Sequence, residues 1–233
     1  MRGNLYEALS LYVVTDERED VESLLTALEG ALVGGCTAVQ LRRKREHGGR
    51  LVEIGRRIRD LTNRYGALLF VNDRVDIALL TDADGVHIGQ SDISCRDARK
   101  LMAKRWVGVS AGTLAEAKAA VADGADYLGV GSIYPTSSKD DADLCGLSTL
   151  ADIAQATTLP IVAIGGIGAS AVPEVIGHGA HGIAVVSAVM SADDPQRAAA
   201  ELKRLLSHPT SAETISNERR SSHGRTSLSN WKI

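Results

Sequence analysis

The feature that most constrains the fold of this chain is an alternation of short apolar runs with longer segments of helical periodicity. Eight runs rich in β-branched residues read as strands: 11–15, 38–42, 67–72, 85–89, 106–110, 127–132, 161–166 and 182–187. Most are continuously apolar, as parallel strands covered on both faces are. Helical segments between or after them fall at 21–35, 49–66, 95–104, 113–124, 148–158 and 196–206. Several of these segments end in glycine, which helix C-termini favour.

Eight β/α units within about 200 residues predict an α/β protein with a closed (β/α)8 TIM barrel, close to the lower end of the size range of that fold. A six-stranded open, doubly wound sheet is the competing architecture. We therefore expect residues 1–207 to form one barrel domain. From 208 to 233 the composition turns to Ser, Thr, Arg and Asn with almost no apolar periodicity, which predicts a disordered tail.

Composition excludes several classes of function. The chain is 44% hydrophobic and 24% charged with a net charge of -3, which is typical of a globular protein. Neither a basic stripe nor interleaved aromatic residues suggest nucleic acid as a partner. The start lacks the features of a signal peptide and no span reaches membrane length, so we expect a cytoplasmic protein. The oligomeric state stays open, and a homo-oligomer is one option.

The cysteines predict neither a disulfide framework nor a thiolate metal site. Cys36, Cys95 and Cys145 are odd in number and have no C-x-x-C spacing. We expect all three to be free thiols.

Polar residues that end the predicted strands are the candidate functional residues, because a barrel of this kind places its chemistry at the carboxyl ends of its strands. Gln40, Arg42 and Lys44 alternate at the end of the second run, so they share one side while the chain stays extended. The run "LLFVNDRVDIALL" ends in an amide and a carboxylate. Further strand-end residues are Asn72, Asp73, Asp92, Ser110, Thr136, Ser137, Ser138, Lys139, Gly165, Gly166, Val186 and Ser187.

The last two predicted strands indicate a phosphate site. Gly165, Gly166, Val186 and Ser187 offer small residues, backbone N–H groups and a hydroxyl, and they stand at the usual phosphate position of this fold. The hydroxyl residues 136–138 are expected to lie next to them. A plain strand-to-helix turn is the alternative interpretation of the glycines. A dinucleotide-binding turn fits less well, because the spacing G-x-G-x-x-G is missing.

Carboxylates and cations from different strand ends indicate a second, more highly charged phosphate group with magnesium. Asp73 and Asp92 would repel each other in a dry cleft, and Mg²⁺ would remove that cost while binding pyrophosphate oxygens. Arg42, Lys44 and Lys139 would supply further positive charge.

Each of these residues has a structural interpretation as well. Asp73 and Arg74 could be a helix N-cap and a surface cation, and Lys139 a solvated loop charge. His87 is expected to be a satisfied core histidine rather than a ligand. Cys145 has no His or Asp at a spacing that would mark it as a nucleophile. The functional interpretation gains weight because the polar residues fall at six different strand ends together.

Assembled in order, the motifs "QLRRK", "VNDRVDIAL", "DGVHIGQSD", "GVS", "GADYLGVGSIYPTSSK", "LPIVAIGGI" and "GIAVVSAV" resemble the thiamine phosphate synthase family over about residues 10–206. The resemblance implies a (β/α)8 barrel that joins 4-amino-2-methyl-5-(diphosphooxymethyl)pyrimidine to 4-methyl-5-(2-phosphoethyl)thiazole. The products would be thiamine phosphate and pyrophosphate, and Mg²⁺ would assist.

The resemblance also implies roles for individual residues. The pyrimidine pyrophosphate would be held by Gln40, Leu41, Arg42, Arg43, Lys44, Asn72, Ser110 and Lys139, and Mg²⁺ by Asp73 and Asp92. The thiazole phosphate would be held by Thr136, Ser137, Ser138, Gly166, Val186 and Ser187. Arg42, Lys44, Ser110 and Lys139 would be catalytic by stabilising the departing pyrophosphate, so that no nucleophilic side chain is needed.

The chain departs from the family pattern at several places, one of which is the loop from Lys139 to Gly146, made acidic by Asp140, Asp141 and Asp143. Arg43 replaces the usual acidic residue in the second strand-end motif, and it should point away from Arg42 and Lys44. Gly112 stands where many members have a histidine, and Ser132 follows Gly131 where many read Gly-Pro.

Two rival functions remain. A thiazole tautomerase shares the barrel and resembles the synthase, but that likeness relies on the histidine that Gly112 replaces. A catalytically silent barrel that binds thiamine precursors is the rival from another class.

Overall fold

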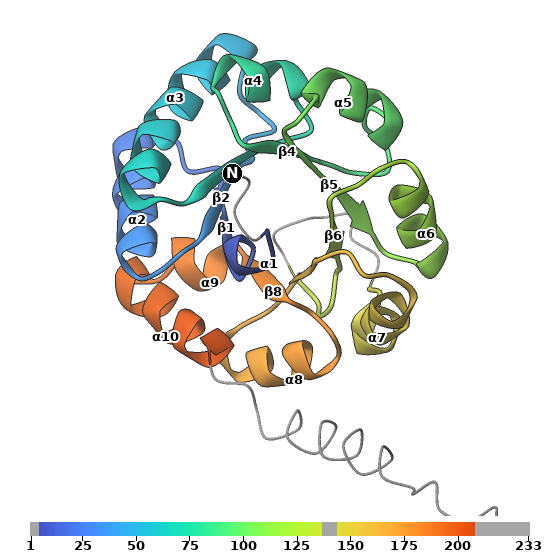
Figure 1. The fold of residues 1–233 in the computed structure, drawn as a ribbon. Coiled ribbons are helices and arrows are strands. Elements are labelled where there is room, and N and C mark those ends of the chain that lie inside the picture. Colours follow the sequence, from blue (N-terminus) through green and yellow to red (C-terminus); the bar gives the residue numbers. More distant parts are fainter. Residues whose placement is uncertain (1–4, 137–143, 208–233) are drawn as a thin grey trace, which may run out of the picture.

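The computed structural model describes residues 5–136 and 144–207, in which parallel strands close into a barrel in the order β1 to β8 (Figure 1). The strands are β1 Leu11–Val14, β2 Ala38–Leu41, β3 Leu68–Asn72, β4 Gly85–Ile88, β5 Trp106–Ala111, β6 Tyr127–Val130, β7 Ile161–Ile164 and β8 Gly182–Val185. β1 pairs with β8 as well as with β2, which confirms the closed barrel and excludes the open sheet. The ends of each predicted strand agree with the structure to within two residues.

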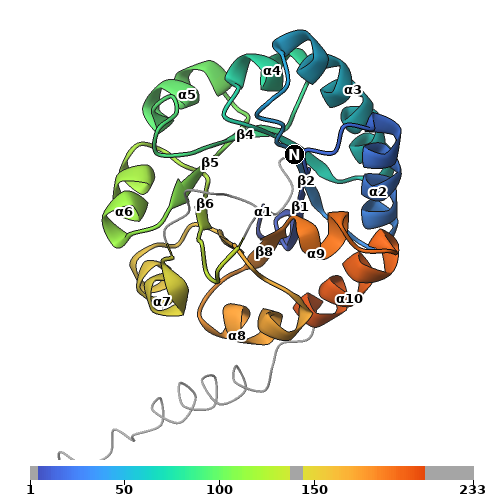
Figure 2. The ribbon, with the colours of Figure 1, turned by 180° about the vertical axis from the view of Figure 1, so that it is seen from behind.

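Helices surround the barrel on its outer side, as two opposite views show (Figures 1 and 2). The outer helices are α2 Val21–Val33, α3 Gly48–Tyr65, α4 Val75–Leu80, α5 Cys95–Met102, α6 Leu114–Ala122, α7 Gly146–Ala156, α8 Val172–Gly177, α9 Ser187–Met190 and α10 Pro195–Ser207. A short 3-10 helix, η1 Ala169–Ala171, leads into α8. Local sequence sets several of the starts: Asp20, Ser94 and Thr113 each accept a hydrogen bond from a backbone N–H in the first turn of α2, α5 and α6.

The apolar side chains form two separate cores because successive strand residues face opposite sides. The larger core lies between the strands and the outer helices and includes Val13, Val39 and Leu69. The smaller core fills the barrel and includes Tyr12, Phe70 and Tyr127. Its further buried members are Leu5, Leu9, Val14, Ala38, Val162 and Ala184.

A short helix, α1 Leu5–Ala8, closes one end of the barrel and was not predicted. Leu5 and the following Leu9 pack into the inner core, and both views show α1 within the ring of strands (Figures 1 and 2). Since α1 leads directly into β1, it occupies the end where the strands begin. The carboxyl ends of the strands, hereafter the mouth, lie at the other end.

Two glycines in the strands make room for large rings inside the barrel. A Cβ on Gly108 of β5 would lie 2.1 Å from Cζ of Tyr127, and one on Gly129 of β6 would lie 2.7 Å from Cε1 of His87. Real Cβ atoms do not approach other atoms so closely, so the two rings occupy space that only glycine leaves open.

Several further expectations concern the whole chain. Cys36, Cys95 and Cys145 are free, as predicted. Within residues 5–136 and 144–207, no helix has both the length and the apolar character needed to cross a membrane. The predicted tail, 208–233, lies outside the described residues.

Candidate active site

The ends of β2, β3 and the segment after β4 bring a cation and two carboxylates together at the mouth. The Nζ of Lys44 lies 3.7 Å from Oδ2 of Asp73, and the Asp73 carboxyl group is within hydrogen-bonding reach of Asp92. The N-cap residue of α4 is Arg74, and its side chain makes no capping hydrogen bond. Asp73 is therefore not the N-cap of this helix, and its side chain meets charged groups of other strand ends.

The backbone holds both carboxylates in place. Asp73 adopts a left-handed conformation with φ of 60°, which is uncommon for a residue other than glycine, and its N–H donates to the His87 carbonyl at 2.8 Å. Asp92 accepts a hydrogen bond from the Gly89 N–H at 2.8 Å. Strained backbone at the carboxyl end of a barrel strand is a feature that clusters at functional sites.

The surroundings of Asp73 disfavour its charge. Burial raises the pKa of Asp73 from 3.8 to about 6, and the neighbouring Asp92 carboxylate adds to the rise, whereas Lys44 and Asn72 lower it. One ammonium therefore does not offset two adjacent carboxylates. Within the described residues no group of three or more His, Cys, Asp or Glu side chains could hold a metal ion, so Asp73 and Asp92 form a pair of carboxylates rather than a full set of protein ligands.

The residues of the motif "QLRRK" divide between the inside and the outside of the barrel. Gln40 points inward, where its Nε2 donates to the Tyr12 hydroxyl at 3.0 Å. Leu41 packs outward in the core beneath the helices, so only its backbone faces the mouth. The Arg42 backbone is fixed by Thr15, whose Oγ1 accepts from the Arg42 N–H at 2.8 Å. Lys44 is exposed.

Arg43 is a structural residue in this chain, and its guanidinium does not face the mouth. The side chain is 3% exposed, donates to the carbonyls of Asp16 and Arg18, and pairs with Glu46 at 2.8 Å. It points away from Lys44, as expected, and toward the loop after β1. The Arg43 side chain is therefore committed to these contacts, and a contact of Arg43 with the pyrimidine pyrophosphate, which stays a prediction, would have to come from its backbone.

Ser110 lies at the carboxyl end of β5 and is linked to groups inside the barrel. Its Oγ lies 3.0 Å from Nε2 of His87, and Nδ1 of His87 lies 3.0 Å from the Tyr127 hydroxyl. His87 is thus a satisfied core histidine, as predicted. Asn72, the last residue of β3, is half-buried next to Asp73.

The ends of β6, β7 and β8 supply the second group of predicted residues. Gly165 and Gly166 have φ values of 103° and 64°, and the exposed Ser187 opens α9 directly after Val186. The segment after β6 lies alongside, because the Tyr134 N–H donates to the Gly165 carbonyl at 3.0 Å. This pairing carries the chain to Thr136, which is partly exposed. Ser137, Ser138 and Lys139 lie outside the described residues.

Both groups of residues lie at the same end of one closed parallel barrel. A sequence model of the family described as thiamine monophosphate synthase matches residues 11–189, which contain all eight strands. The chain belongs to this family. Among the similar proteins, the thiamine-phosphate synthase of Pyrococcus horikoshii is 45% identical over 87% of this chain and 97% of its own length. That of Chloroflexus aurantiacus is 50% identical, over 84% and 92% respectively.

A solved structure supports the assignment to the thiamine monophosphate synthase family. The thiamine phosphate pyrophosphorylase from Pyrococcus furiosus superposes with a TM-score of 0.80 at 43% identity, over 87% of this chain and 98% of that one. The family resemblance expected from the strand-end motifs is thereby confirmed.

Sequence reasoning missed part of what surrounds the candidate site in this family member. Tyr12 and Tyr127 are buried in the barrel, and their hydroxyl groups, 3.2 Å apart, connect Gln40 to His87. Gly108 and Gly129 were the available signal, because glycine within a buried strand marks the close approach of another group.

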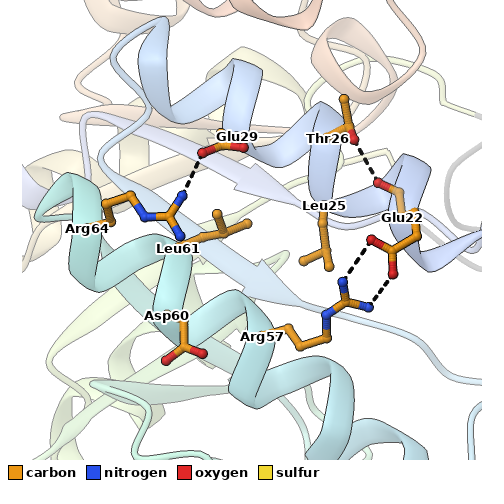
Figure 3. A pocket seen from close by; sticks show the side chains of 8 residues that line it. All are labelled: Glu22, Leu25, Thr26, Glu29, Arg57, Asp60, Leu61 and Arg64. Carbon is orange, nitrogen blue, oxygen red and sulfur yellow. Dashed lines mark hydrogen bonds and ion pairs between the residues drawn. The ribbon is translucent and has the colours of Figure 1, made fainter.

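A groove on the outside of the barrel, between α2 and α3, is separate from the mouth (Figure 3). It has a volume of about 310 Å³ and is lined by Glu22, Leu25, Thr26, Glu29, Arg57, Asp60, Leu61 and Arg64. Arg57 pairs with Glu22 at 2.7 Å and Arg64 with Glu29 at 2.9 Å, so most of its charges are already matched. We therefore assign it no ligand.

Proposed function

We propose that this chain condenses 4-amino-2-methyl-5-(diphosphooxymethyl)pyrimidine with 4-methyl-5-(2-phosphoethyl)thiazole to give thiamine phosphate and pyrophosphate. Membership of the thiamine monophosphate synthase family supports the reaction. The observation that carries it for this chain is the meeting of Lys44, Asp73 and Asp92 at the mouth. A divalent cation would bind the two carboxylates, and a diphosphate would bind both that cation and the Lys44 ammonium group.

We also propose that Asp73 and Asp92 hold Mg²⁺. Burial and the neighbouring Asp92 carboxylate raise the pKa of Asp73 to about 6. Two ionised carboxylates therefore repel each other at this place, and a bound cation would remove that repulsion. When bound, Mg²⁺ would offset the two carboxylates and coordinate pyrophosphate oxygens, and the remaining negative charge of the departing pyrophosphate would be left to the neighbouring cations.

The chemical step needs stabilisation of the leaving group and alignment of the two substrates. It does not need a covalent bond between the protein and a substrate. The bond between the pyrimidine methylene carbon and the pyrophosphate oxygen breaks, and its electron pair leaves with pyrophosphate. The lone pair of the thiazole nitrogen then forms the new C–N bond. Arg42, Lys44 and Lys139 would stabilise the departing anion by charge, and Ser110 by a hydrogen bond.

The thiazole phosphate would bind on the β6 to β8 side of the mouth. Gly165 and Gly166 take left-handed backbone conformations that let the chain turn closely against the segment after β6, and Val186 and Ser187 present backbone at the start of α9. Thr136, with Ser137 and Ser138, would add hydroxyl donors. Holding this phosphate fixes the thiazole nitrogen relative to the pyrimidine methylene carbon.

The two rival functions are distinguished from the synthase in different ways. The likeness to a thiazole tautomerase would need a histidine side chain at position 112, and Gly112 has none. The Gly112 N–H is already used, because it donates to Glu116 Oε2 at 2.7 Å. A silent precursor-binding barrel would bind the diphosphate with the same charges but would release no pyrophosphate, so turnover distinguishes it from the synthase. Cytoplasmic localisation and a homo-oligomer both stay predictions.

The test of this proposal is to incubate the purified protein with both substrates and Mg²⁺ and to quantify thiamine phosphate by chromatography. We expect many turnovers per protein molecule. Tight binding of the pyrimidine pyrophosphate without product would favour the silent barrel instead.

A further inference from the structure

A continuous chain of hydrogen bonds crosses the interior of the barrel and ends on two residues of the candidate site. It runs from Gln40 Nε2 to the Tyr12 hydroxyl at 3.0 Å, then to the Tyr127 hydroxyl at 3.2 Å. From there it reaches His87 Nδ1 at 3.0 Å, and His87 Nε2 reaches Ser110 Oγ at 3.0 Å. Five different strands, β1, β2, β4, β5 and β6, contribute one residue each.

The middle of this series of hydrogen bonds is closed to water. Tyr12 and Tyr127 are 1% and 0% exposed, and Gln40 is 5% exposed. Burial raises the pKa of both phenols well above 10, so each keeps its single proton. A buried hydroxyl with one proton can donate only once, and its other neighbour must therefore donate to it.

The orientation of the Gln40 amide, followed by a count of protons, gives this series of hydrogen bonds one direction. The Gln40 amide donates to Tyr12, so the Tyr12 proton goes to the Tyr127 oxygen. The Tyr127 proton then goes to Nδ1 of His87, which must be unprotonated, and the neutral ring carries its proton on Nε2. Nε2–H donates to Ser110, so the hydroxyl proton of Ser110 is directed elsewhere than to His87.

We propose that Tyr12, Tyr127 and His87 are positioning residues that fix which hydrogen-bonding role, donor or acceptor, Gln40 and Ser110 offer to the substrate. With the direction given above, Ser110 offers its hydroxyl proton as a donor, and the Gln40 amide offers its carbonyl oxygen as an acceptor. Reversing every bond would turn the Gln40 amide over, move the His87 proton to Nδ1 and leave Ser110 with only lone pairs. The two ends are thus coupled through the barrel core.

This coupling selects the chemical class of the ring that binds, an inference that rests on the proposed function. An aminopyrimidine offers an amino donor and ring-nitrogen acceptors, which match a carbonyl acceptor on Gln40 and a hydroxyl donor on Ser110. A 4-oxopyrimidine offers the opposite pattern at these positions, a carbonyl acceptor and a ring N–H donor. Leaving buried polar groups unpaired is costly, so the network would discriminate against the 4-oxo ring.

The packing of the barrel supports a built network rather than an accidental one. Gly108 and Gly129 leave the space that the rings of Tyr127 and His87 fill, and any Cβ at either position would overlap these rings. The Tyr127 ring also packs edge-on against Phe70, with centroids 5.4 Å apart. Rings locked in this way hold their polar atoms at fixed positions.

The first test reads the His87 tautomer directly in the wild-type protein, without any turnover. Long-range ¹H–¹⁵N NMR of histidine-labelled protein at pH 7.5, assigned with His87→Asn, distinguishes a proton on Nε2 from one on Nδ1. We expect the Nε2–H tautomer. A proton on Nδ1, alone or in a doubly protonated ring, would overturn the proposed direction.

The second test compares kcat/KM for the 4-amino pyrimidine pyrophosphate with that for its 4-oxo analogue. Tyr127→Phe keeps the ring and removes the hydroxyl, and we expect the preference for the 4-amino substrate to fall about tenfold, mostly through KM. Tyr65→Phe, an exposed tyrosine on α3 whose hydroxyl donates to Glu29, serves as control and should leave the preference unchanged.

The outcomes separate this inference from the proposed function. An unchanged preference in folded Tyr127→Phe protein would contradict the positioning role even if wild-type turnover is high. If that variant does not fold, the His87 tautomer of the wild type decides alone. A wild type that makes no thiamine phosphate would count against the function, whereas the tautomer would still support or overturn the network.

Discussion

The ammonium group of Lys44 lies 3.7 Å from the Asp73 carboxylate, although the two residues follow different strands of the barrel. This contact shows that β2 and β3 direct opposite charges to one place at the mouth. Because Asp92 adds a second carboxylate beside Asp73, negative charge is still in excess there. The proposed cation site depends on this excess.

Replacing Asp92 with alanine should abolish magnesium-dependent turnover, with a fall in kcat on the order of 10³-fold, because one of two cation ligands and its charge are lost. Thermal stability should change little, since removing one carboxylate relieves the repulsion on Asp73 and offsets the lost hydrogen bond from the Gly89 N–H. Steady-state kinetics with varied Mg²⁺ and a melting curve measure both. Asp76→Ala, which removes an exposed carboxylate paired with Arg74, is the matched control. Intact turnover in Asp92→Ala would refute the metal assignment.

The raised pKa of Asp73 predicts a pH dependence of stability in metal-free protein. The folded carboxyl group titrates at about 6 and the unfolded one near 3.8, so between these values the folded state binds a proton that the unfolded state releases. This contribution is complete below the unfolded pKa and is lost as the pH rises through 6. Relative to Asp73→Asn, the wild type should therefore lose stability from pH 4 to pH 7.

Urea unfolding of both proteins in EDTA at several pH values measures this difference. The account is contradicted if wild-type stability relative to Asp73→Asn stays constant or rises over that range. Added Mg²⁺ at pH 7.5 should stabilise the wild type more than the variant, because a cation favours the ionised carboxylates.

The strand pattern predicted the architecture because burial on both faces leaves a strong local signal. All eight strands were found, and so was the side of the barrel that carries Asp73 and Asp92. The short α1, α8 and α9 were not predicted, since four to six residues give too little periodicity, and α8 carries a proline in its first turn.

Side-chain partners from distant strands could not be predicted from the sequence. Arg43 faces the loop after β1, a contact that no local pattern encodes. The meeting of Tyr12 with Tyr127 likewise depends on the closure of the barrel. Strand alternation could place such residues inside or outside, but it could not say which atoms meet.

Replacing Arg43 with alanine should lower the free energy of unfolding by about 3 kcal/mol, because the buried guanidinium holds two backbone carbonyls and Glu46. Arg45→Ala, at an exposed neighbouring position, should change stability by no more than about 0.5 kcal/mol. Urea titrations of the three proteins provide the comparison. Equal stabilities would show that the Arg43 contacts contribute nothing measurable.

Two glycines at β5 offer a matched pair of substitutions. Gly108→Ala should lower the free energy of unfolding by about 3 kcal/mol, because its Cβ would lie 2.1 Å from the Tyr127 ring. Gly112→Ala should change it by about 0.5 kcal/mol or less, since the nearest atom to its Cβ is 3.6 Å away. Thermal or urea unfolding measures both, and similar losses in the two variants would argue against the packed interior described here.

The most direct test of the central claim is the rate of pyrophosphate release by the wild-type protein with both substrates, as Mg²⁺ is titrated from zero in a chelating buffer. We predict one pyrophosphate per thiamine phosphate formed, at a rate that rises and saturates with Mg²⁺ and falls to background in EDTA. Release that proceeds equally fast in EDTA, or that is absent at every Mg²⁺ concentration, would contradict the account.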